Sequence, residues 1–199
     1  MDRERVRWIA EMEMKHRREH DAREPGWLYF HGLRTAKIAL NLRRRLRLEV
    51  SDDVLFAGAM FHDIGKGKPR HNVVGAEITR RLLVSCCEPG ELKEICRLVE
   101  MHNHRDCRPS LPLAVQILQD ADTLDHVGEI GVWLAFYYSG SRGETAQDTA
   151  RFISGERNQQ KRLKMRTDLH FPISVAMFDR RIRWEDAHFA RFGEVYHGR

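Results

Sequence analysis

The chain has 199 residues, of which 42% are hydrophobic, so it can bury one hydrophobic core without stabilising disulfides or structural metals. A net charge of +5 suits phosphorylated ligands, although it falls short of indicating a nucleic-acid partner. No apolar run reaches the roughly 18 residues of a membrane span, and the charged start argues against a secretory signal peptide. The cysteines form no CxxC pair. We therefore expect a soluble, reduced, cytoplasmic protein whose oligomeric state is open.

Hydrophobic residues recur at helical spacing along most of the chain, and no alternating β-branched stretch indicates a strand. The sequence therefore predicts an all-α helical bundle. In chain order, the expected helices cover 3–22, 28–47, 54–63, 72–85, 91–103, a long segment beginning near Leu113, 149–165 and 174–195. Ser51 or Asp52 is expected to cap the third of these helices. The small, polar residues 139–148 are the expected loop.

The strongest local motif is the segment FHDIGK, which places His62 and Asp63 at the end of an apolar helix. Burying an imidazole beside a carboxylate is costly unless another group compensates. A divalent cation does so, because both side chains are good ligands. Gly65 predicts the helix end that lets two adjacent residues reach one ion.

Further ligands must come from other helices. His31 lies on the apolar stripe of the helix predicted at 28–47. The run QDADTLD, with carboxylates at Asp120, Asp122 and Asp125, lies on the helix that begins near Leu113. Helical bundles build metal sites in this way, from side chains on facing helices. The pattern predicts a metal site in the core.

The order His31, His62-Asp63, Asp122 resembles the HD-domain superfamily of metal-dependent phosphohydrolases. The resemblance implies one catalytic domain over 1–199, with an HD core at about 28–138 and flanking helices at 3–22 and 149–195. It also implies the metal ligands His31, His62, Asp63 and Asp122. Asp120 is then expected beside the ligands or at the substrate, in a catalytic position.

The acidic run, followed by GEIG at 128–131, is similar to small bacterial HD hydrolases that cleave nucleoside triphosphates. Thr123 departs from that group, which usually has Arg after the ligand Asp. We expect catalysis with Asp63, Lys66, Asp120 and Arg34. The expected phosphate contacts are Lys66, Lys68, Arg70 and His104.

A second resemblance concerns additional histidines. His71 and His102 fall where two-metal HD proteins, such as diadenosine tetraphosphate hydrolases, place extra ligands. Asp63 would then bridge two ions that clamp a phosphate. The absence of a GYP tripeptide argues against an HD-GYP phosphodiesterase. His126 is interpreted here as structural or solvated.

The predicted function is hydrolysis of a phosphoester or phosphoanhydride bond of a nucleotide or other phosphorylated small molecule. One or two divalent ions (Mn, Fe, Co, Ni, Zn or Mg) would lower the pKa of a bound water and polarise a phosphoryl oxygen. A two-metal dinucleoside polyphosphate hydrolase is one alternative. A second is a non-catalytic HD module that senses a nucleotide, and a third is a nucleic-acid phosphodiesterase.

Overall fold

The computed structural model describes residues 1–18, 23–105, 110–196 and 198. These residues form helices and no strand, which confirms the all-α prediction. The helices are α1 (Arg3–Met14), α2 (Trp27–Leu46), α3 (Asp52–Phe61), α4 (His71–Leu83), α5 (Pro89–Met101), α6 (Leu113–Asp125), α7 (Glu129–Ser141), α8 (Ala146–Ser154), α9 (Glu156–Thr167) and α10 (Pro172–Tyr196). In this described part, no helix is both long and apolar enough to cross a membrane.

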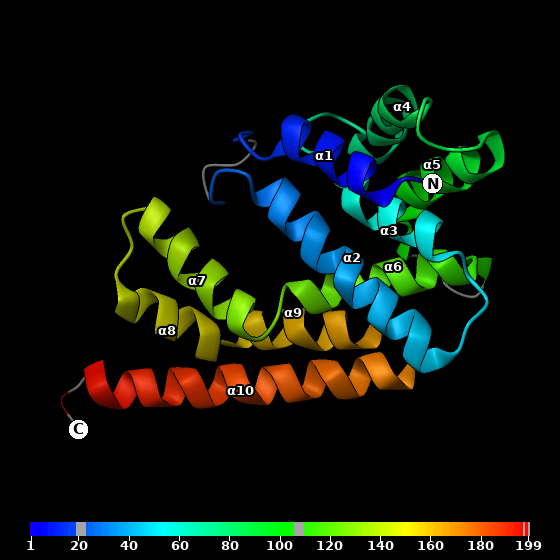
Figure 1. The fold of residues 1–199 in the computed structure, drawn as a ribbon. Coiled ribbons are helices and arrows are strands. Elements are labelled where there is room, and N and C mark those ends of the chain that lie inside the picture. The colour runs from blue at the N-terminus through cyan, green and yellow to red at the C-terminus, as the bar shows by residue number, and fades with distance from the viewer. Residues whose placement is uncertain (19–22, 106–109, 197, 199) are drawn as a thin grey trace.

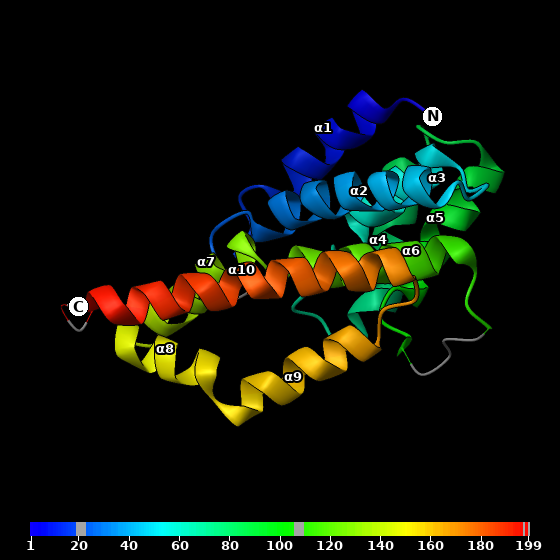
Figure 2. The same ribbon diagram turned by 90° about the horizontal axis from the view of Figure 1, so that it is seen from below.

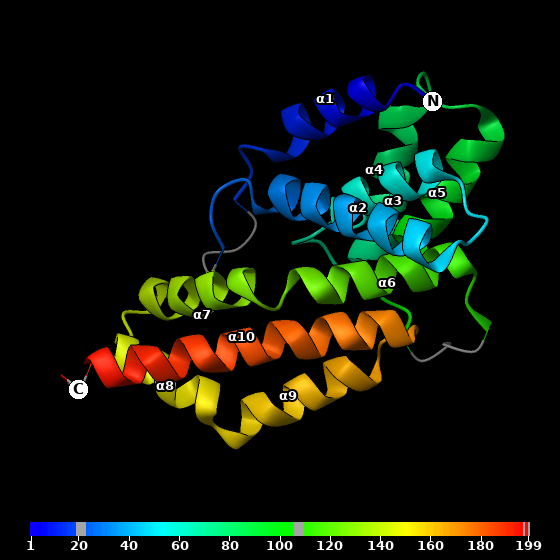
Figure 3. The same cartoon turned by 60° about the horizontal axis from the view of Figure 1, so that its bottom comes forward.

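Helices α2, α3, α5 and α6 surround the main core, and Figure 1 shows α2 running across α3 and α6. Fully buried side chains such as Leu42, Leu55, Phe61, Ile95 and Leu118 fill the space between them. The long helix α10 runs alongside α6 and α7 (Figures 2 and 3), while α8 and α9 meet at an angle (Figure 2). The molecule therefore has a helical core around α2–α6 and a second group of helices, α7–α10, beside it.

Two glycines permit the close approaches that build the core. A Cβ on Gly32 of α2 would lie 2.5 Å from the main-chain oxygen of Met60 in α3. A Cβ on Gly65 would overlap the main-chain oxygen of His71, at the start of α4. Because only glycine leaves this space, α2 and α4 can both approach the end of α3. His31, His71 and the His-Asp pair are thereby brought to one place.

The predicted helix starts agree well with the structure where a cap is visible in the sequence. The Ser51 hydroxyl accepts a hydrogen bond from the Val54 N–H, so Ser51 is the N-cap of α3, as predicted. A capping box between Glu88 and Glu91 begins α5. These local contacts satisfy N–H groups that have no partner within their helix.

Several predicted boundaries are wrong. The first helix ends at Met14, not at residue 22, although 19–22 lie outside the described residues. The predicted long helix breaks after Asp125, because Gly128 adopts φ +83° and its N–H donates to Glu185 at 2.9 Å. Helix α7 then continues to Ser141, into the predicted loop.

The helix predicted at 149–165 is also two helices. Gly155 has an extended backbone, which ends α8 and begins α9. A capping box between Thr145 and Asp148 starts α8 earlier than predicted, within the expected loop. Both corrections concern the group of helices beside the main core.

Candidate metal centre

Two imidazoles meet where α2 crosses the end of α3. The Nε2 atoms of His31 and His62 lie 3.1 Å apart, and both side chains are buried. The Asp122 carboxylate of α6 lies 3.3 Å from Nε2 of His31 and 3.8 Å from Nε2 of His62. The structure therefore brings together three of the four predicted ligands from three helices.

The hydrogen bonds on Nδ1 define which ring nitrogen can bind a metal. Nδ1 of His62 and of His102 each lies within 2.8 Å of the carbonyl oxygen three residues earlier. Nδ1 of His31 lies 2.7 Å from Oδ2 of Asp125. Because carbonyl and carboxylate oxygens only accept, these Nδ1 atoms carry hydrogen, and a neutral ring presents its Nε2 lone pair. This arrangement fits a divalent cation, since metal-binding histidines are held in the same way.

The charges of the centre also fit a cation. Burial lowers the pKa of His62 to about 4, so its ring is neutral near pH 7. Burial acts in the same direction on His31, but Asp122 and Asp125 outweigh it and raise its pKa to about 9. The pKa of Asp122 is lowered by His31 despite burial, so this carboxylate is ionised. A proton on His31 and a cation would therefore compete for the same carboxylate.

Asp63 is shared between two groups of ligand atoms. One group is His31, His62 and Asp63, and the other is Asp63, His71 and His102; within each, the atoms lie no more than 4.8 Å apart. Oδ1 of Asp63 lies 3.5 Å from Nε2 of His102 and 3.7 Å from Nε2 of His71. In the described part of the chain, the buried Nε2 of His71 has no hydrogen-bond partner. This donor set suits a second cation next to the first.

A third group contains His31, Asp122 and His126. Nδ1 of His126 donates to the main-chain oxygen of Asp122 at 2.9 Å, and burial lowers the pKa of its ring. His126, interpreted from the sequence as structural or solvated, thus lies at the centre. Its position one helical turn after Asp122 is the signal that was available.

Comparisons with known proteins identify the family of the chain. The HD domain family matches residues 28–126. The chain belongs to the HD-domain superfamily. No curated protein matches its sequence significantly.

Solved structures share the fold at low identity. Bacillus subtilis YpgQ in complex with ADP is 15% identical, with 98% of each chain covered and a TM-score of 0.67. An HD-superfamily hydrolase from Bacillus thuringiensis is 18% identical over 100% of each chain, with a TM-score of 0.70. A predicted HD-superfamily hydrolase from an uncultured Thermotogales bacterium is 19% identical, covers 98% of this chain and 92% of its own, and has a TM-score of 0.63. The likeness of fold to these structures thus extends beyond residues 28–126, over 98–100% of the chain.

Two arginines hold the carboxylates of this HD centre. Arg34, predicted to be a catalytic residue, makes a forked contact with Asp125, with Nε 2.8 Å from Oδ1 and Nη2 3.0 Å from Oδ2. Arg34 thereby holds in place the Asp125 carboxylate, which accepts the hydrogen bond from Nδ1 of His31. Arg105, which belongs to none of the sequence motifs, donates to Oδ2 of Asp122 at 3.2 Å. Its other terminal nitrogen, Nη1, is buried and has no partner among the described residues.

Asp120 occupies a different place from the predicted catalytic one. Its side chain is fully buried, and its oxygens accept from the main-chain N–H groups of His170 and Phe171 at 2.8 and 3.2 Å. These residues directly precede α10, so Asp120 ties the start of α10 to α6. These two hydrogen bonds make Asp120 a structural anchor between α6 and α10.

The predicted phosphate contacts separate into two sets. Lys66 lies beside the centre, with Nζ 3.2 Å from Oδ2 of Asp63. Lys68 and Arg70 are exposed on the turn before α4, and no ion pair connects them to the centre within the described residues. His104 is exposed, with Nε2 3.3 Å from the Asn72 amide nitrogen.

A small cavity opens beside the ligands. Its volume is about 130 Å³, and its lining residues are Arg23, Glu24, Trp27, Leu28, Asp63, Lys66 and His126. It is therefore bounded by an imidazole, two cationic side chains and two carboxylates, one of which is the candidate metal ligand Asp63. A phosphoryl group matches this combination of charges.

Proposed function

We propose that this HD protein is a metal-dependent phosphohydrolase that cleaves a phosphoester or phosphoanhydride bond of a nucleotide. The observation that carries the proposal is the set of histidines whose Nδ1 atoms are engaged, leaving Nε2 beside Asp63 and Asp122. The fold shared with HD-superfamily hydrolases supports hydrolysis, and the ADP bound to YpgQ supports a nucleotide.

The ligand set would be His31, His62, Asp63 and Asp122, with His126 as an additional donor. A divalent cation bound there supplies an activated water and polarises a phosphoryl oxygen. Lys66, which lines the small cavity, supplies a positive charge that stabilises negative charge developing on phosphate. Nη1 of Arg105 has no hydrogen-bond partner among the described residues, so Arg105 supplies a second donor beside Asp122.

A two-ion hydrolase is a second candidate, favoured by one observation. His71 and His102 lie close to Asp63, and Nε2 of His71 is buried with no hydrogen-bond partner among the described residues. A second cation would give this nitrogen a partner. Metal content per chain separates the candidates: near one ion supports the single-ion enzyme, and near two supports the two-ion enzyme.

The test is hydrolysis of nucleoside mono-, di- and triphosphates and diadenosine tetraphosphate, with Mg, Mn, Fe, Co, Ni and Zn supplied separately. Products are identified by mass. We expect product from one substrate group, and its loss in Asp63→Ala. The matched control is Asp53→Ala, because Asp53 pairs with Arg3 at the other end of α3. Tight nucleotide binding without product in any metal would contradict the proposal and favour the sensing module.

A further inference from the structure

A large cavity lies between α7, α8 and α9 and meets the candidate metal centre at His126. Its volume is about 1020 Å³, at the upper end of the usual size for sites that bind small organic ligands. His126 lines both this cavity and the small cavity that contains Asp63 and Lys66. A ligand whose phosphoryl group lies beside Asp63 therefore has room for its organic part beyond His126.

Phe152 gives this cavity an aromatic surface. Its ring is 47% exposed, and in the described part of the chain no other aromatic ring or cationic group lies over it. The neighbouring Tyr138 ring, by contrast, already contacts a guanidinium, with Cζ of Arg142 5.2 Å from the ring centroid. Apolar side chains complete this part of the wall: Leu134, Ile153 and Met165. Phe152 therefore offers a free face on which a planar organic group can stack.

Two buried polar side chains in the wall have unused hydrogen-bonding capacity. Ser139 of α7 is 5% exposed, and its hydroxyl has no hydrogen-bond partner among the described residues. Asn158 of α9 is 6% exposed, and its Nδ2 donates to the main-chain oxygen of Ile153 at 3.0 Å. This contact fixes the orientation of the amide, because a carbonyl oxygen can only accept.

The other end of the same amide is available to a ligand. Oδ1 of Asn158 accepts from no residue in the described ranges, although the side chain lines the cavity. Buried polar atoms are rarely left without a partner, so Oδ1 of Asn158 and the Ser139 hydroxyl indicate a polar ligand. An oxygen that only accepts selects a ligand that donates an N–H or O–H.

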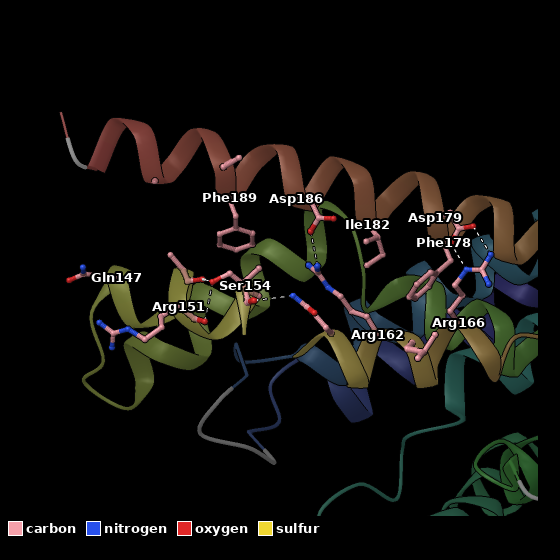
Figure 4. A pocket seen from close by; sticks show the side chains of 16 residues that line it. Gln147, Arg151, Ser154, Arg162, Arg166, Phe178, Asp179, Ile182, Asp186 and Phe189 are labelled. Atoms are coloured by element: carbon pink, nitrogen blue, oxygen red, sulfur yellow. Dashed lines mark hydrogen bonds and ion pairs between the residues drawn. The ribbon is translucent and has the colours of Figure 1, made fainter. Parts of the chain in front are cut away.

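The groove on the other side of α9 provides a contrast. It has a volume of about 860 Å³ and lies between α8, α9 and α10 (Figure 4). Arg162 donates to Asp186 across this groove at 2.7 Å, and Arg166 donates to Asp179 at the same distance (Figure 4). None of the candidate metal ligands lines it. The groove is thus similar in size, but it does not reach the metal centre.

We propose that the cavity beside His126 binds the base of the nucleotide whose phosphate lies at the metal centre. The Phe152 ring stacks on the base, Oδ1 of Asn158 accepts from an N–H on the edge of the base, and the Ser139 hydroxyl binds a second polar atom of that edge. This assignment rests on the proposed function and deepens it. Phe152 and Asn158 become specificity-determining residues, which favour nucleotides over phosphates that carry no base.

The first experiment compares two probes by isothermal titration calorimetry on the manganese-loaded protein. The probes are α,β-methylene-ADP and methylenediphosphonate, which has the same P–C–P group without a nucleoside. We expect Phe152→Ala to weaken binding of the nucleotide analogue about 5-fold or more and to leave methylenediphosphonate unchanged. The matched control is Leu163→Ala, because Leu163 is also exposed and apolar but lines the groove of Figure 4.

The second experiment tests the polar edge with the α,β-methylene diphosphate of purine riboside, which lacks the amino group of adenine. The wild-type protein should bind it about 5-fold more weakly than α,β-methylene-ADP, and Asn158→Ala should remove that preference. Asn158→Ala also loses the contact with Ile153. Ser139→Ala removes only a hydroxyl, and it should weaken α,β-methylene-ADP without changing methylenediphosphonate.

Four results would overturn the base site: equal wild-type affinity for α,β-methylene-ADP and methylenediphosphonate, no binding of the analogue, an unchanged affinity in Phe152→Ala, or the same loss in Leu163→Ala. The two proposals fail separately. Selective loss in Phe152→Ala without turnover of any nucleotide supports the base site and contradicts the hydrolase. Turnover whose KM is indifferent to Phe152→Ala contradicts the base site alone.

Discussion

Gly32 in α2 lies directly against the main-chain carbonyl of Met60 in α3, so closely that an added Cβ would lie 2.5 Å from the oxygen. His31 is the neighbour of Gly32, and His62 follows Met60 by two residues. The contact between the two backbones therefore determines the 3.1 Å distance between the imidazole nitrogens.

Substituting Gly32→Ala should separate α2 from α3 and damage the centre. Because the contact is with backbone, which cannot rotate away, we expect a loss of about 1–3 kcal/mol in the free energy of unfolding. We also expect weaker metal binding. Denaturant unfolding and metal titration measure both effects. Gly90→Ala is the control, since a Cβ there meets nothing within 4 Å. Equal stability of the two variants would show that the close approach does not constrain the helices.

Replacing His71 should lower the metal content without abolishing it. If His71 and His102 hold a second ion with Asp63, His71→Ala should change the stoichiometry from near two ions per chain to near one. Elemental analysis after dialysis gives the number. The exposed His16 provides the control variant His16→Ala. A wild-type content of one ion, unchanged in His71→Ala, would leave His71 without a metal-binding role.

Arg34 should contribute to stability through Asp125, which is 2% exposed. Among the described residues, Arg34→Met leaves His31 as the remaining hydrogen-bond partner of that carboxylate, and we expect a cost of about 1.5–3 kcal/mol in the free energy of unfolding. Arg34→Lys should cost less, because it keeps the charge but loses the fork. Thermal or chemical unfolding tests this, with Arg44→Met on the exposed side of α2 as control. If Arg34→Met and the control unfold alike, the pair is not stabilising.

Asp120 should behave as a structural residue. Asp120→Ala leaves the N–H groups of His170 and Phe171 without acceptors, and we expect a cost of about 1–3 kcal/mol in the free energy of unfolding. Metal content, measured where the variant is folded, should equal that of the wild type. A variant that keeps its stability but loses metal or turnover would return Asp120 to the catalytic position that the sequence suggested.

Local patterns in the sequence were sufficient for the helical class and for much of the centre. Apolar spacing placed His31 on the inward face of its helix, and the FHDIGK segment located the end of α3. Both features depend on residues within one or two helical turns of each other, and helical periodicity and capping are signals of this short range. The breaks at Gly128 and Gly155 were missed because a glycine inside a helical pattern also occurs within continuous helices.

The sequence by itself determined that this chain is a helical HD protein, and it identified His31, His62, Asp63 and Asp122 as candidate ligands. Only the tertiary structure decided which partners the charged residues around those ligands have. It turned Arg34 toward Asp125, 91 positions away, and placed Asp120 at the start of α10, 50 positions away. The reason is physical: a carboxylate on an inward helix face can accept a hydrogen bond from the N–H of a metal-binding histidine, from an arginine or from a backbone N–H. Which of these it meets depends on how helices distant in the chain cross.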